Sequence, residues 1–324
     1  MLYPAGACAA ARADHGEGPD PTMPGWRTTL TAAGISGSRQ RADFTHAARR
    51  VARREPAPYA ALRLLAAPPL QPWLAAGLAF MNRVDDVAET GTARRRTAGL
   101  AALEEDFEAA VRTGAGADPL VRAYAHAVNT RGLPVRWVSR FIEGAVTFEA
   151  AFDGFATEAD FQDYLDAYAW PAVLAFVGLQ YQGGPDEEQA AGWRRFVEAA
   201  QRVDFLADLA SDLAEGRLCI PRARLAEHGV TRADLEQARD TPAVRALLDS
   251  ERGLARTALD ATDGLVDLAV PGLRPMIATM TELMTHQLAA VERAGVKALR
   301  EDIGYGLVAP MRTLLRARGA RARA

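Results

Sequence analysis

The sequence is almost without lysine: of its 38 lysine and arginine side chains, only Lys297 is a lysine. It also has only two cysteines, Cys8 and Cys219, which excludes a disulfide framework and indicates a reducing, cytoplasmic setting. A formal net charge of -3 gives no electrostatic reason to expect nucleic-acid binding. No apolar run reaches about 18 residues, so no membrane-spanning helix is predicted, although a weak contact with a membrane surface stays open.

Several motifs that carry common chemistries are also missing. There is no glycine-rich phosphate loop, no nucleophile elbow and no pairing of a cysteine with a histidine. The five histidines show no metal-ligand spacing; they are His15, His46, His126, His228 and His286. The acidic side chains are therefore the main candidates for chemistry.

The chain is long enough for one large domain with a sizeable core. Residues 1–40 are rich in glycine, proline and alanine, and we expect them to form a disordered or loosely ordered leader. Over residues 41–317, apolar side chains recur at intervals of three and four, and no stretch alternates with a period of two. This pattern predicts an all-α domain, a single helical bundle around a central cavity, followed by a basic tail over 318–324.

Local signals mark some helix boundaries. Thr157 with Asp160, and Thr231 with Asp234, have the outline of capping boxes with aspartate in place of glutamate. Pro171 falls inside a helix predicted over 158–181, where its missing N–H should produce a kink. Residues 186–214 are predicted to form one long helix.

An acidic stripe lies near the end of that helix. The stretch VDFLADLASDLAEGR places Asp204, Asp208 and Asp212 at successive intervals of four, with leucine and phenylalanine between them. On a helix these carboxylates share one face and repel one another by a few tenths of a kcal/mol per pair, by order of magnitude. Such a stripe on an otherwise apolar helix needs a compensating charge.

A second acidic group stands at the end of another apolar helix. The stretch AFMNRVDDVAETG places Asp85 and Glu89 at i and i+4, with Asp86 beside them. Asp86 points about 100° away from Asp85 around the helix, which indicates a structural role rather than a ligand role. Either group alone is more simply a solvated helix face, but the two together predict two acidic patches that face each other.

Two facing carboxylate patches with few nearby cations suit a hard divalent metal. Mg²⁺ prefers oxygen ligands and is commonly held by one or two carboxylates together with water and substrate phosphate oxygens. Two such patches can hold a diphosphate between them and stabilise it as a leaving group. The residues therefore predict Mg²⁺-dependent chemistry on a diphosphate ester.

At these residues the chain resembles the squalene/phytoene synthase family, the head-to-head isoprenyl synthases with the isoprenoid synthase fold. The first family motif reads roughly CRxxDDxxD, and the corresponding stretch here is MNRVDDVAE. The second reads roughly NxxRDxxEDxxxGRxYLP, and here it is DFLADLASDLAEGRLCIP, continuing to RARLAEHGV. The resemblance covers about residues 42–300 and is most specific in LAEGRLCIPRARLAEHGV.

The resemblance implies a role for each matching residue. Two or three Mg²⁺ ions, bound together with the substrate diphosphate, would be held by Asp85, Glu89, Asp204, Asp208 and Asp212. Asp85, Glu89, Asp208 and Asp212 would be the catalytic carboxylates, and Arg217 would reach the diphosphate. The substrate would be an allylic isoprenoid diphosphate, and the activity that of a prenyltransferase in isoprenoid biosynthesis.

The chain departs from the family at positions that contact diphosphate. Asn82 replaces an arginine of the first motif, Ala207 an arginine of the second, and Cys219 a tyrosine. A family segment resembling His-Ser-x-Ser-Phe, which helps hold diphosphate, reads REPAPYAAL here and contains Tyr59. These changes keep the expected metal ligands but alter how substrates are positioned.

The departures favour a single allylic diphosphate whose carbocation passes to a different acceptor. Aromatic side chains stabilise cations through their quadrupole, although plain core packing is the simpler reading of each one. The residues expected to line the substrate pocket are Asn82, Tyr59, Phe148, Phe152, Tyr164, Tyr168, Trp170 and Phe176.

The nature of the acceptor leaves alternatives open. A small aromatic metabolite, giving a prenylated product of secondary metabolism, ranks first. Head-to-head coupling to a squalene-like or phytoene-like product follows closely, and a class I terpene cyclase ranks third. A helical binding protein that has lost catalysis is the non-enzyme alternative, and the oligomeric state is left open.

Overall fold

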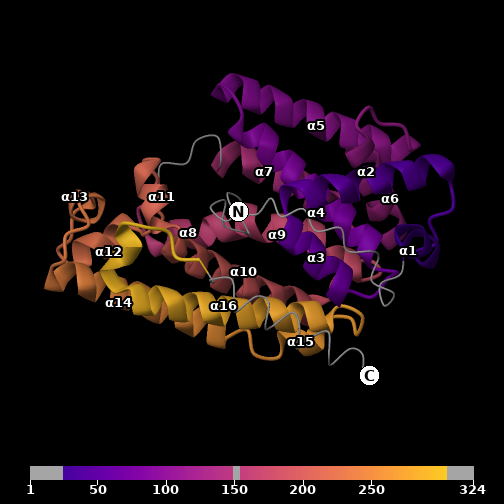
Figure 1. Cartoon of the computed structure of the whole chain (residues 1–324). Coiled ribbons are helices and arrows are strands. Elements are labelled where there is room, and N and C mark those ends of the chain that lie inside the picture. The colour runs from indigo at the N-terminus through magenta and orange to yellow at the C-terminus, as the bar shows by residue number, and fades with distance from the viewer. Residues whose placement is uncertain (1–24, 149–153, 305–324) are drawn as a thin grey trace, which may run out of the picture.

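The computed structural model describes residues 25–148 and 154–304, and every regular element in these two stretches is a helix. The all-α class predicted from the sequence is therefore confirmed. No helix in the described part of the chain is both long enough and apolar enough to cross a membrane. Figure 1 shows the elements of the N-terminal half on one side of the molecule and the long C-terminal helices on the other.

The N-terminal half is built around a buried helix. Its elements are α1 (Trp26–Ala32), α2 (Ser38–Arg54), α3 (Pro56–Leu65), α4 (Gln71–Glu89), α5 (Ala93–Thr113), α6 (Pro119–Arg131) and α7 (Val135–Phe148). Helix α4 packs against α2, α5, α6 and α9, and nearly every residue from 71 to 84 is buried. A helix that is apolar on all sides belongs inside the core, and α4 carries its carboxylates only in its last two turns.

The C-terminal half is longer and more irregular. Its elements are α8 (Glu158–Tyr164), the π-helical turn η2 (Leu165–Ala169), α9 (Trp170–Val177), the 3₁₀ turn η3 (Gly178–Gln180), α10 (Glu187–Ala207), α11 (Leu209–Ala214), α12 (Arg222–Glu227), α13 (Arg232–Glu236), α14 (Pro242–Asp260), α15 (Leu265–Leu268), α16 (Arg274–Ala294) and the 3₁₀ turn η4 (Gly295–Leu299). Helices α10, α14 and α16 pack against one another along the lower part of Figure 1.

Two apolar clusters support these helices. The larger one runs through α1 to α10 and returns through α14 to α16. The smaller one joins α11 to α12, α13 and the start of α14, and Leu209 and Leu213 contribute from α11. Helix α11 is therefore anchored on a core of its own.

Helical structure is present before the expected domain boundary at residue 41. Residues 26–32 form α1, and Leu30 and Ile35 are only 2% and 1% exposed, because both side chains pack into the larger cluster. Residues 1–24 of the expected leader, and the basic tail over 318–324, lie outside the described residues.

Both predicted capping boxes are present. Thr157 Oγ1 accepts a hydrogen bond from the backbone N–H of Asp160, whose carboxylate accepts one from the N–H of Thr157 at 2.7 Å. Thr231 and Asp234 make the same exchange. Each pair satisfies two donors that the helix start would otherwise leave without partners.

The irregularity expected at Pro171 takes the form of the π-helical turn η2, which ends just before α9. Proline offers no N–H, so the regular hydrogen-bond ladder cannot pass through it. Helix α7 approaches this turn closely at Gly144, where an added Cβ would lie 2.4 Å from the carbonyl oxygen of Ala167. This close approach positions η2 against α7, and η2 in turn places the Tyr168 hydroxyl near Asp85 of α4.

We expect Gly144→Ala to lower the free energy of unfolding by about 1–3 kcal/mol, because the methyl group would overlap backbone that cannot move independently. The matched control is Gly253→Ala on α14, where nothing lies within 4 Å of an added Cβ. There the substitution should stabilise by about 0.5–1 kcal/mol through helix propensity. Urea unfolding of the two variants measures both effects, and equal stabilities would refute the close contact at η2.

Candidate active site

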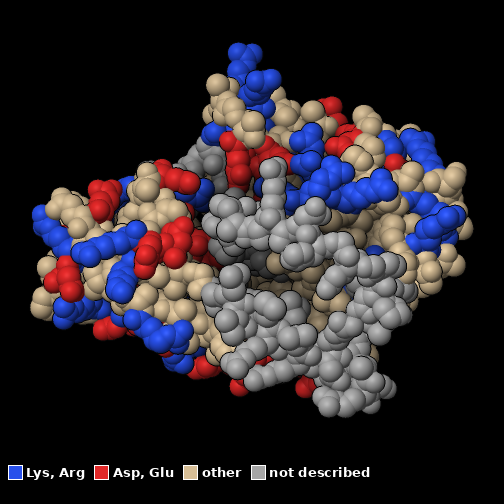
Figure 2. All heavy atoms as spheres, in the orientation of Figure 1, with Lys and Arg blue, Asp and Glu red and all other residues tan. Residues whose placement is uncertain are grey.

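The first acidic motif consists of Asp85, Asp86 and Glu89 in the last two turns of α4. Two guanidinium groups of α2, those of Arg50 and Arg54, form ion pairs with Asp86. These pairs neutralise Asp86 and agree with its interpretation as a structural residue. On the face shown in Figure 2, basic side chains gather over α2 and acidic side chains lie beside them.

Asp85 points to a different neighbour. The hydroxyl of Tyr168 in η2 donates a long hydrogen bond of 3.5 Å to Asp85 Oδ1. Asp85 is half-buried, whereas Glu89 is exposed at the end of α4. The motif thus offers a carboxylate at the protein surface and another beside an aromatic side chain.

The second acidic motif consists of Asp204 in α10, Asp208 between α10 and α11, and Asp212 in α11. Burial, together with the charges of Asp208 and Asp212, raises the pKa of Asp204 to about 8. Burial and the charges of Asp302 and Asp212 raise the pKa of Asp208 to about 6. Burial is the main reason why these carboxyl groups ionise less readily than they would in water, and the neighbouring carboxylates add to its effect.

The single helix predicted over 186–214 is wrong, because the chain breaks at Asp208. In a continuous helix the N–H of Ser211 would bond to the carbonyl of Ala207. Here the Ala207 carbonyl accepts from the N–H of Ile303 at 2.8 Å, and the Ser211 N–H donates to Asp302 Oδ1 at 3.0 Å. In a regular helix the Ala207 carbonyl and the Ser211 N–H would bond to each other. Here each of them bonds instead to one of two consecutive residues of a distant segment, Ile303 and Asp302.

Asp302 is the residue of this site that the sequence did not reveal. It lies 91 positions from Ser211, in a short segment after η4 with no periodicity and no motif. Side-chain capping over such a distance leaves no local signal. The break itself also has no local signal, since no proline or glycine stands at residues 207–211.

Removing the Asp302 acceptor should misplace Asp208 and Asp212. We expect Asp302→Ala to lower kcat/KM about tenfold, because the lost hydrogen bond, worth about 1 kcal/mol, helps to hold the helix break that orients Asp208 and Asp212. Asp302→Asn keeps an acceptor oxygen and should retain most of the activity. Glu301→Ala is the control, since the Glu301 side chain makes no hydrogen bond or ion pair with a described residue. An asparagine variant as impaired as the alanine variant would show that the charge, not the hydrogen bond, is what matters.

Asp212 is held by two further groups. The thiol of Cys219 donates to Asp212 Oδ2 at 3.4 Å, and Arg217 Nε lies 4.0 Å from Asp212 Oδ1. Burial and the nearby Asp212 charge raise the pKa of Cys219 well above its ordinary value, so the thiol keeps the proton that it donates. Cys219 therefore serves Asp212 as a hydrogen-bond donor.

Aromatic side chains connect the two acidic motifs. The ring of Tyr168 stacks on Phe141 at 5.9 Å and lies 5.7 Å from the ring of Tyr164. Tyr164 in turn donates its hydroxyl to Gln201 Oε1 of α10 at 3.0 Å, one turn before Asp204. A continuous aromatic surface therefore runs from Asp85 toward the second motif.

The remaining predicted pocket residues are only partly brought to this surface. Phe148 meets Tyr164 edge-on at 5.6 Å. Tyr59, Trp170 and Phe176 belong to or pack against the larger apolar cluster, and the described part of the chain contains no hydrogen bond or ring contact from them to either motif. Phe152 lies outside the described residues.

The candidate metal ligands of the two motifs are all carboxylates. Within residues 25–148 and 154–304, no three carboxylate, histidine or cysteine side chains come close enough to hold a metal ion by themselves. All candidate ligands are carboxylate oxygens, which is the donor type that Mg²⁺ prefers, and the ion commonly takes only one or two of them. Burial and neighbouring carboxylates raise the pKa values of Asp204 and Asp208, and a bound cation would offset both effects. The residues therefore fit Mg²⁺ that is shared with a phosphate-bearing substrate.

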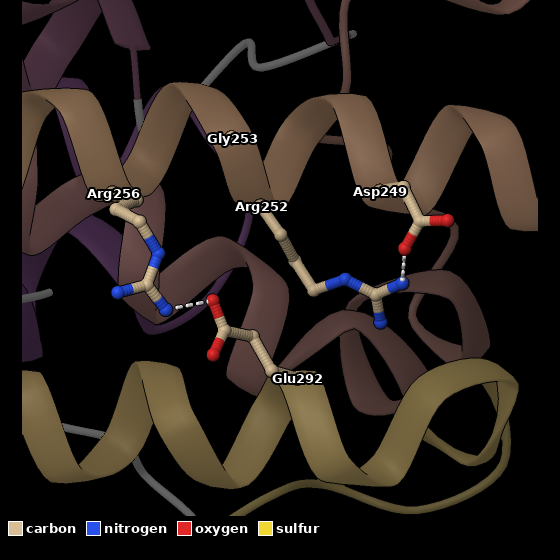
Figure 3. A pocket seen from close by; sticks show the side chains of 5 residues that line it. All are labelled: Asp249, Arg252, Gly253, Arg256 and Glu292. Carbon is tan, nitrogen blue, oxygen red and sulfur yellow. Dashed lines mark hydrogen bonds and ion pairs between the residues drawn. The ribbon is translucent and has the colours of Figure 1, made fainter.

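Two concave features near the C-terminal half do not suit that substrate. A cavity of about 20 Å³, bordered by Phe161, Phe205 and Cys219, has room for about one water molecule. A surface groove between α14 and α16 contains two arginines, Arg252 and Arg256, each already paired with an acidic side chain (Figure 3). The groove therefore carries no uncompensated positive charge for a diphosphate.

A helical bundle with two aspartate-rich motifs on separate helices defines a protein of the isoprenoid synthase fold. A model of the squalene/phytoene synthase family matches residues 26–307, so the chain belongs to this family. Members of the family are prenyltransferases that use isoprenyl diphosphates. The predicted family, fold and enzyme class are thereby confirmed.

Individual relatives place the chain within the family. It is 28% identical to the squalene synthase HpnC of Alicyclobacillus acidocaldarius, with a TM-score of 0.72, over 82% of this chain and 98% of that one. A dehydrosqualene synthase in complex with a ligand has the same fold, with a TM-score of 0.73 at 16% identity, over 91% of this chain and 100% of that one.

A curated relative, the bifunctional protein CrtB/UppS of Streptomyces coelicolor, is 28% identical over 218 residues. The match covers 67% of this chain, and it spans 38% of the length of that relative.

Proposed function

We propose that the protein is a Mg²⁺-dependent prenyltransferase that ionises one allylic isoprenoid diphosphate and transfers the prenyl carbocation to a small aromatic acceptor. Asp85, Glu89, Asp208 and Asp212, with Asp204, would hold two or three Mg²⁺ ions against the diphosphate. Bound Mg²⁺ would supply Lewis acidity that stabilises the departing diphosphate. Arg217, next to Asp212, would donate to a diphosphate oxygen.

The observation that carries this proposal is the position of Tyr168. Its hydroxyl reaches Asp85, while its ring belongs to the aromatic surface that continues to Tyr164 and Phe148. An aromatic surface next to the leaving-group site stabilises a carbocation and can stack against an aromatic acceptor. Tyr164 and Tyr168 are buried, so they also keep water from the cation.

A second candidate function is head-to-head coupling of two prenyl diphosphates. It is favoured by the similarity to a squalene synthase over nearly the whole of that enzyme. The changes at Asn82, Ala207 and Cys219 argue for a different second substrate, because they remove cationic and phenolic groups near the carboxylates. A terpene cyclase and a protein without catalysis are the remaining outcomes of the test below.

Product analysis by mass spectrometry distinguishes these functions. The full chain is incubated with Mg²⁺ and dimethylallyl, geranyl, farnesyl or geranylgeranyl diphosphate, with and without a panel of electron-rich aromatic compounds. A prenylated aromatic that forms only with both partners and disappears with EDTA is the expected result. A hydrocarbon formed without an aromatic compound overturns it, and its carbon count separates a cyclase from a head-to-head synthase.

If no product forms, the binding of inorganic diphosphate separates an unidentified acceptor from a protein without catalysis. Stabilisation of the fold by diphosphate only when Mg²⁺ is present supports an enzyme, because ligand binding raises apparent stability by mass action. Its absence supports the non-catalytic alternative. A role in secondary metabolism and a cytoplasmic location belong to the proposal as well.

A further inference from the structure

A ladder of polar side chains joins α10 to the two short elements that carry Tyr164 and Tyr168. It consists of two rows, and in each row the side chains stand at intervals of four residues, the spacing that places them on one face of a helix. The row on α8 and η2 is Glu158, Gln162 and Asp166, and the row on α10 is Arg194, Glu198 and Arg202. We refer to these six side chains as the polar ladder.

The ladder is most buried near the start of α8. The guanidinium of Arg202 donates to the Glu158 carboxylate and lies over the ring of Phe161, with its central carbon 4.5 Å from the ring centre. The Arg202 side chain is only 10% exposed. One turn further along, Gln162 Nε2 donates to Glu198 Oε1 at 3.1 Å. These two contacts determine where α8 begins on the surface of α10.

The last pair of the ladder lies on the π-helical turn η2. Arg194 Nε donates to Asp166 Oδ1 at 2.5 Å, and another nitrogen of the same guanidinium donates to Gln162 Oε1 at 2.8 Å. Positions 158, 162 and 166 thus meet positions 202, 198 and 194, so all three pairs share one antiparallel register. Sliding α8 and η2 along α10 by one turn would break every pair.

Short elements such as these depend on contacts of this kind. Helix α8 has seven residues and η2 has five, and helices of this length are not stable in isolation. One support of η2 is the close approach of α7 at Gly144. Another is the ion pair of Asp166 with Arg194, which joins the turn to α10.

The position of η2 matters because the turn connects the two acidic motifs. It carries Tyr168, two residues after Asp166, and the Tyr168 hydroxyl reaches Asp85 of the first motif. Helix α10, on the other side of the ladder, carries Asp204 of the second motif two residues after Arg202. The ladder therefore fixes a group at the first motif relative to the helix that bears the second.

We propose that Arg194 is a positioning residue for prenyl transfer, which acts through Asp166 to hold the Tyr168 hydroxyl beside Asp85. This inference rests on the proposed function, in which Tyr168 lies next to the departing diphosphate and the carbocation. In the described part of the chain, the Arg194 guanidinium bonds within the ladder and to neither acidic motif. Its effect on the reaction is therefore indirect.

A double-mutant cycle with Tyr168→Phe tests whether Arg194 acts through that hydroxyl. With Mg²⁺ and an allylic diphosphate, Arg194→Gln should lower kcat for diphosphate release about fivefold and leave KM within about twofold. This factor corresponds to about 1 kcal/mol, the upper end for a partly exposed ion pair. In the Tyr168→Phe background the same substitution should change kcat less than about twofold, because the hydroxyl that it positions is gone.

Matched variants separate this pair from a general loss of stability. Asp166→Asn should reproduce the defect of Arg194→Gln, and the two substitutions together should be no worse than either one. Arg194→Lys keeps the charge and should restore most of the lost turnover. Arg256→Gln breaks an ion pair between α14 and α16 and should leave kcat unchanged. Equal effects of Arg194→Gln with and without the Tyr168 hydroxyl would overturn the proposal.

¹⁹F NMR of the full chain with 3-fluorotyrosine in place of tyrosine follows Tyr168 without turnover. The Tyr168 signal is identified by its loss in Tyr168→Phe. It should shift in Arg194→Gln and in Asp166→Asn but not in Arg256→Gln, and an unchanged signal in both ladder variants would overturn the positioning role. A wild type that releases no diphosphate from any allylic diphosphate would overturn the proposed function instead, and the NMR result would still decide whether Arg194 positions Tyr168.

Discussion

Replacing Asp208 or Asp85 with asparagine should reduce the turnover number about a thousandfold or more while the protein remains folded. Each substitution would take an anionic oxygen ligand from the Mg²⁺ that stabilises the leaving diphosphate. A loss of about 4 kcal/mol of this stabilisation corresponds to a thousandfold lower turnover number. Diphosphate release under saturating Mg²⁺ measures the effect. Turnover close to that of the wild type in either variant would remove these residues from the metal assignment.

Stability measurements on the same variants separate a lost ligand from a damaged fold. Burial and the neighbouring carboxylates raise the pKa of Asp208 to about 6, so its charge at pH 7 is unfavourable in the metal-free protein. Asp208→Asn should therefore unfold at the same temperature as the wild type or at a higher one. Asp163→Asn, at an exposed position of α8, controls for the chemical change and should alter neither turnover nor stability.

The metal-free protein should become less stable as the pH rises from about 4 to about 8. Asp204 has a pKa of about 8 in the folded protein against an ordinary value of 3.8, so over this interval the native state binds more protons than the unfolded state. The free energy of unfolding then falls with pH, by up to about 1.4 kcal/mol per pH unit for one such group. Below about pH 4 both states are protonated, and this dependence disappears.

Chemical denaturation across this pH range, for the wild type and Asp204→Asn, isolates the contribution of one carboxyl group. The variant should show a flatter profile and should be more stable than the wild type near pH 8. Mg²⁺ with inorganic diphosphate should stabilise the wild type more at pH 8 than at pH 6, because the bound ion favours the ionised carboxylates. Identical profiles for the two proteins would contradict the burial of Asp204.

The sequence predicted the fold because its signals are local and repeated. The spacing of apolar residues defines most helices, and the capping boxes at Thr157 and Thr231 locate two helix starts to the residue. The leader was harder to predict: α1 has only seven residues, and its order depends on Leu30 and Ile35 meeting the core, which no local pattern reports. Short elements that are stabilised by tertiary contacts escape periodicity.

The two acidic motifs could be recognised in the sequence, and their role as metal ligands stays a prediction, whereas their contacts could not be predicted. Regular spacing identified both acidic motifs, since carboxylates on an apolar helix are conspicuous. The hydrogen bonds from Ile303 to Ala207 and from Ser211 to Asp302 join residues about 90 positions apart, so nothing near Asp208 announces the break. Only some of the predicted aromatic residues lie near the motifs, and the reason is similar. Which side chains face the motifs depends on the π-helical turn η2. A proline in the sequence predicts an irregular helix there, but not how the irregularity turns the side chains.

The exchanged hydrogen bonds at the break also determine when, during synthesis, the second acidic motif reaches its final shape. Until residues 302 and 303 have been added, the Ala207 carbonyl and the Ser211 N–H can bond to each other, which favours one uninterrupted helix. At about 5–20 residues per second, the ribosome needs between about 5 and 20 s to make the 91 residues that separate Ser211 from Asp302. Asp208 and Asp212, which would bind the metal, are thus translated well before the residues that fix their orientation. A nascent chain that ends before residue 302 therefore lacks the contacts that shape the proposed diphosphate site.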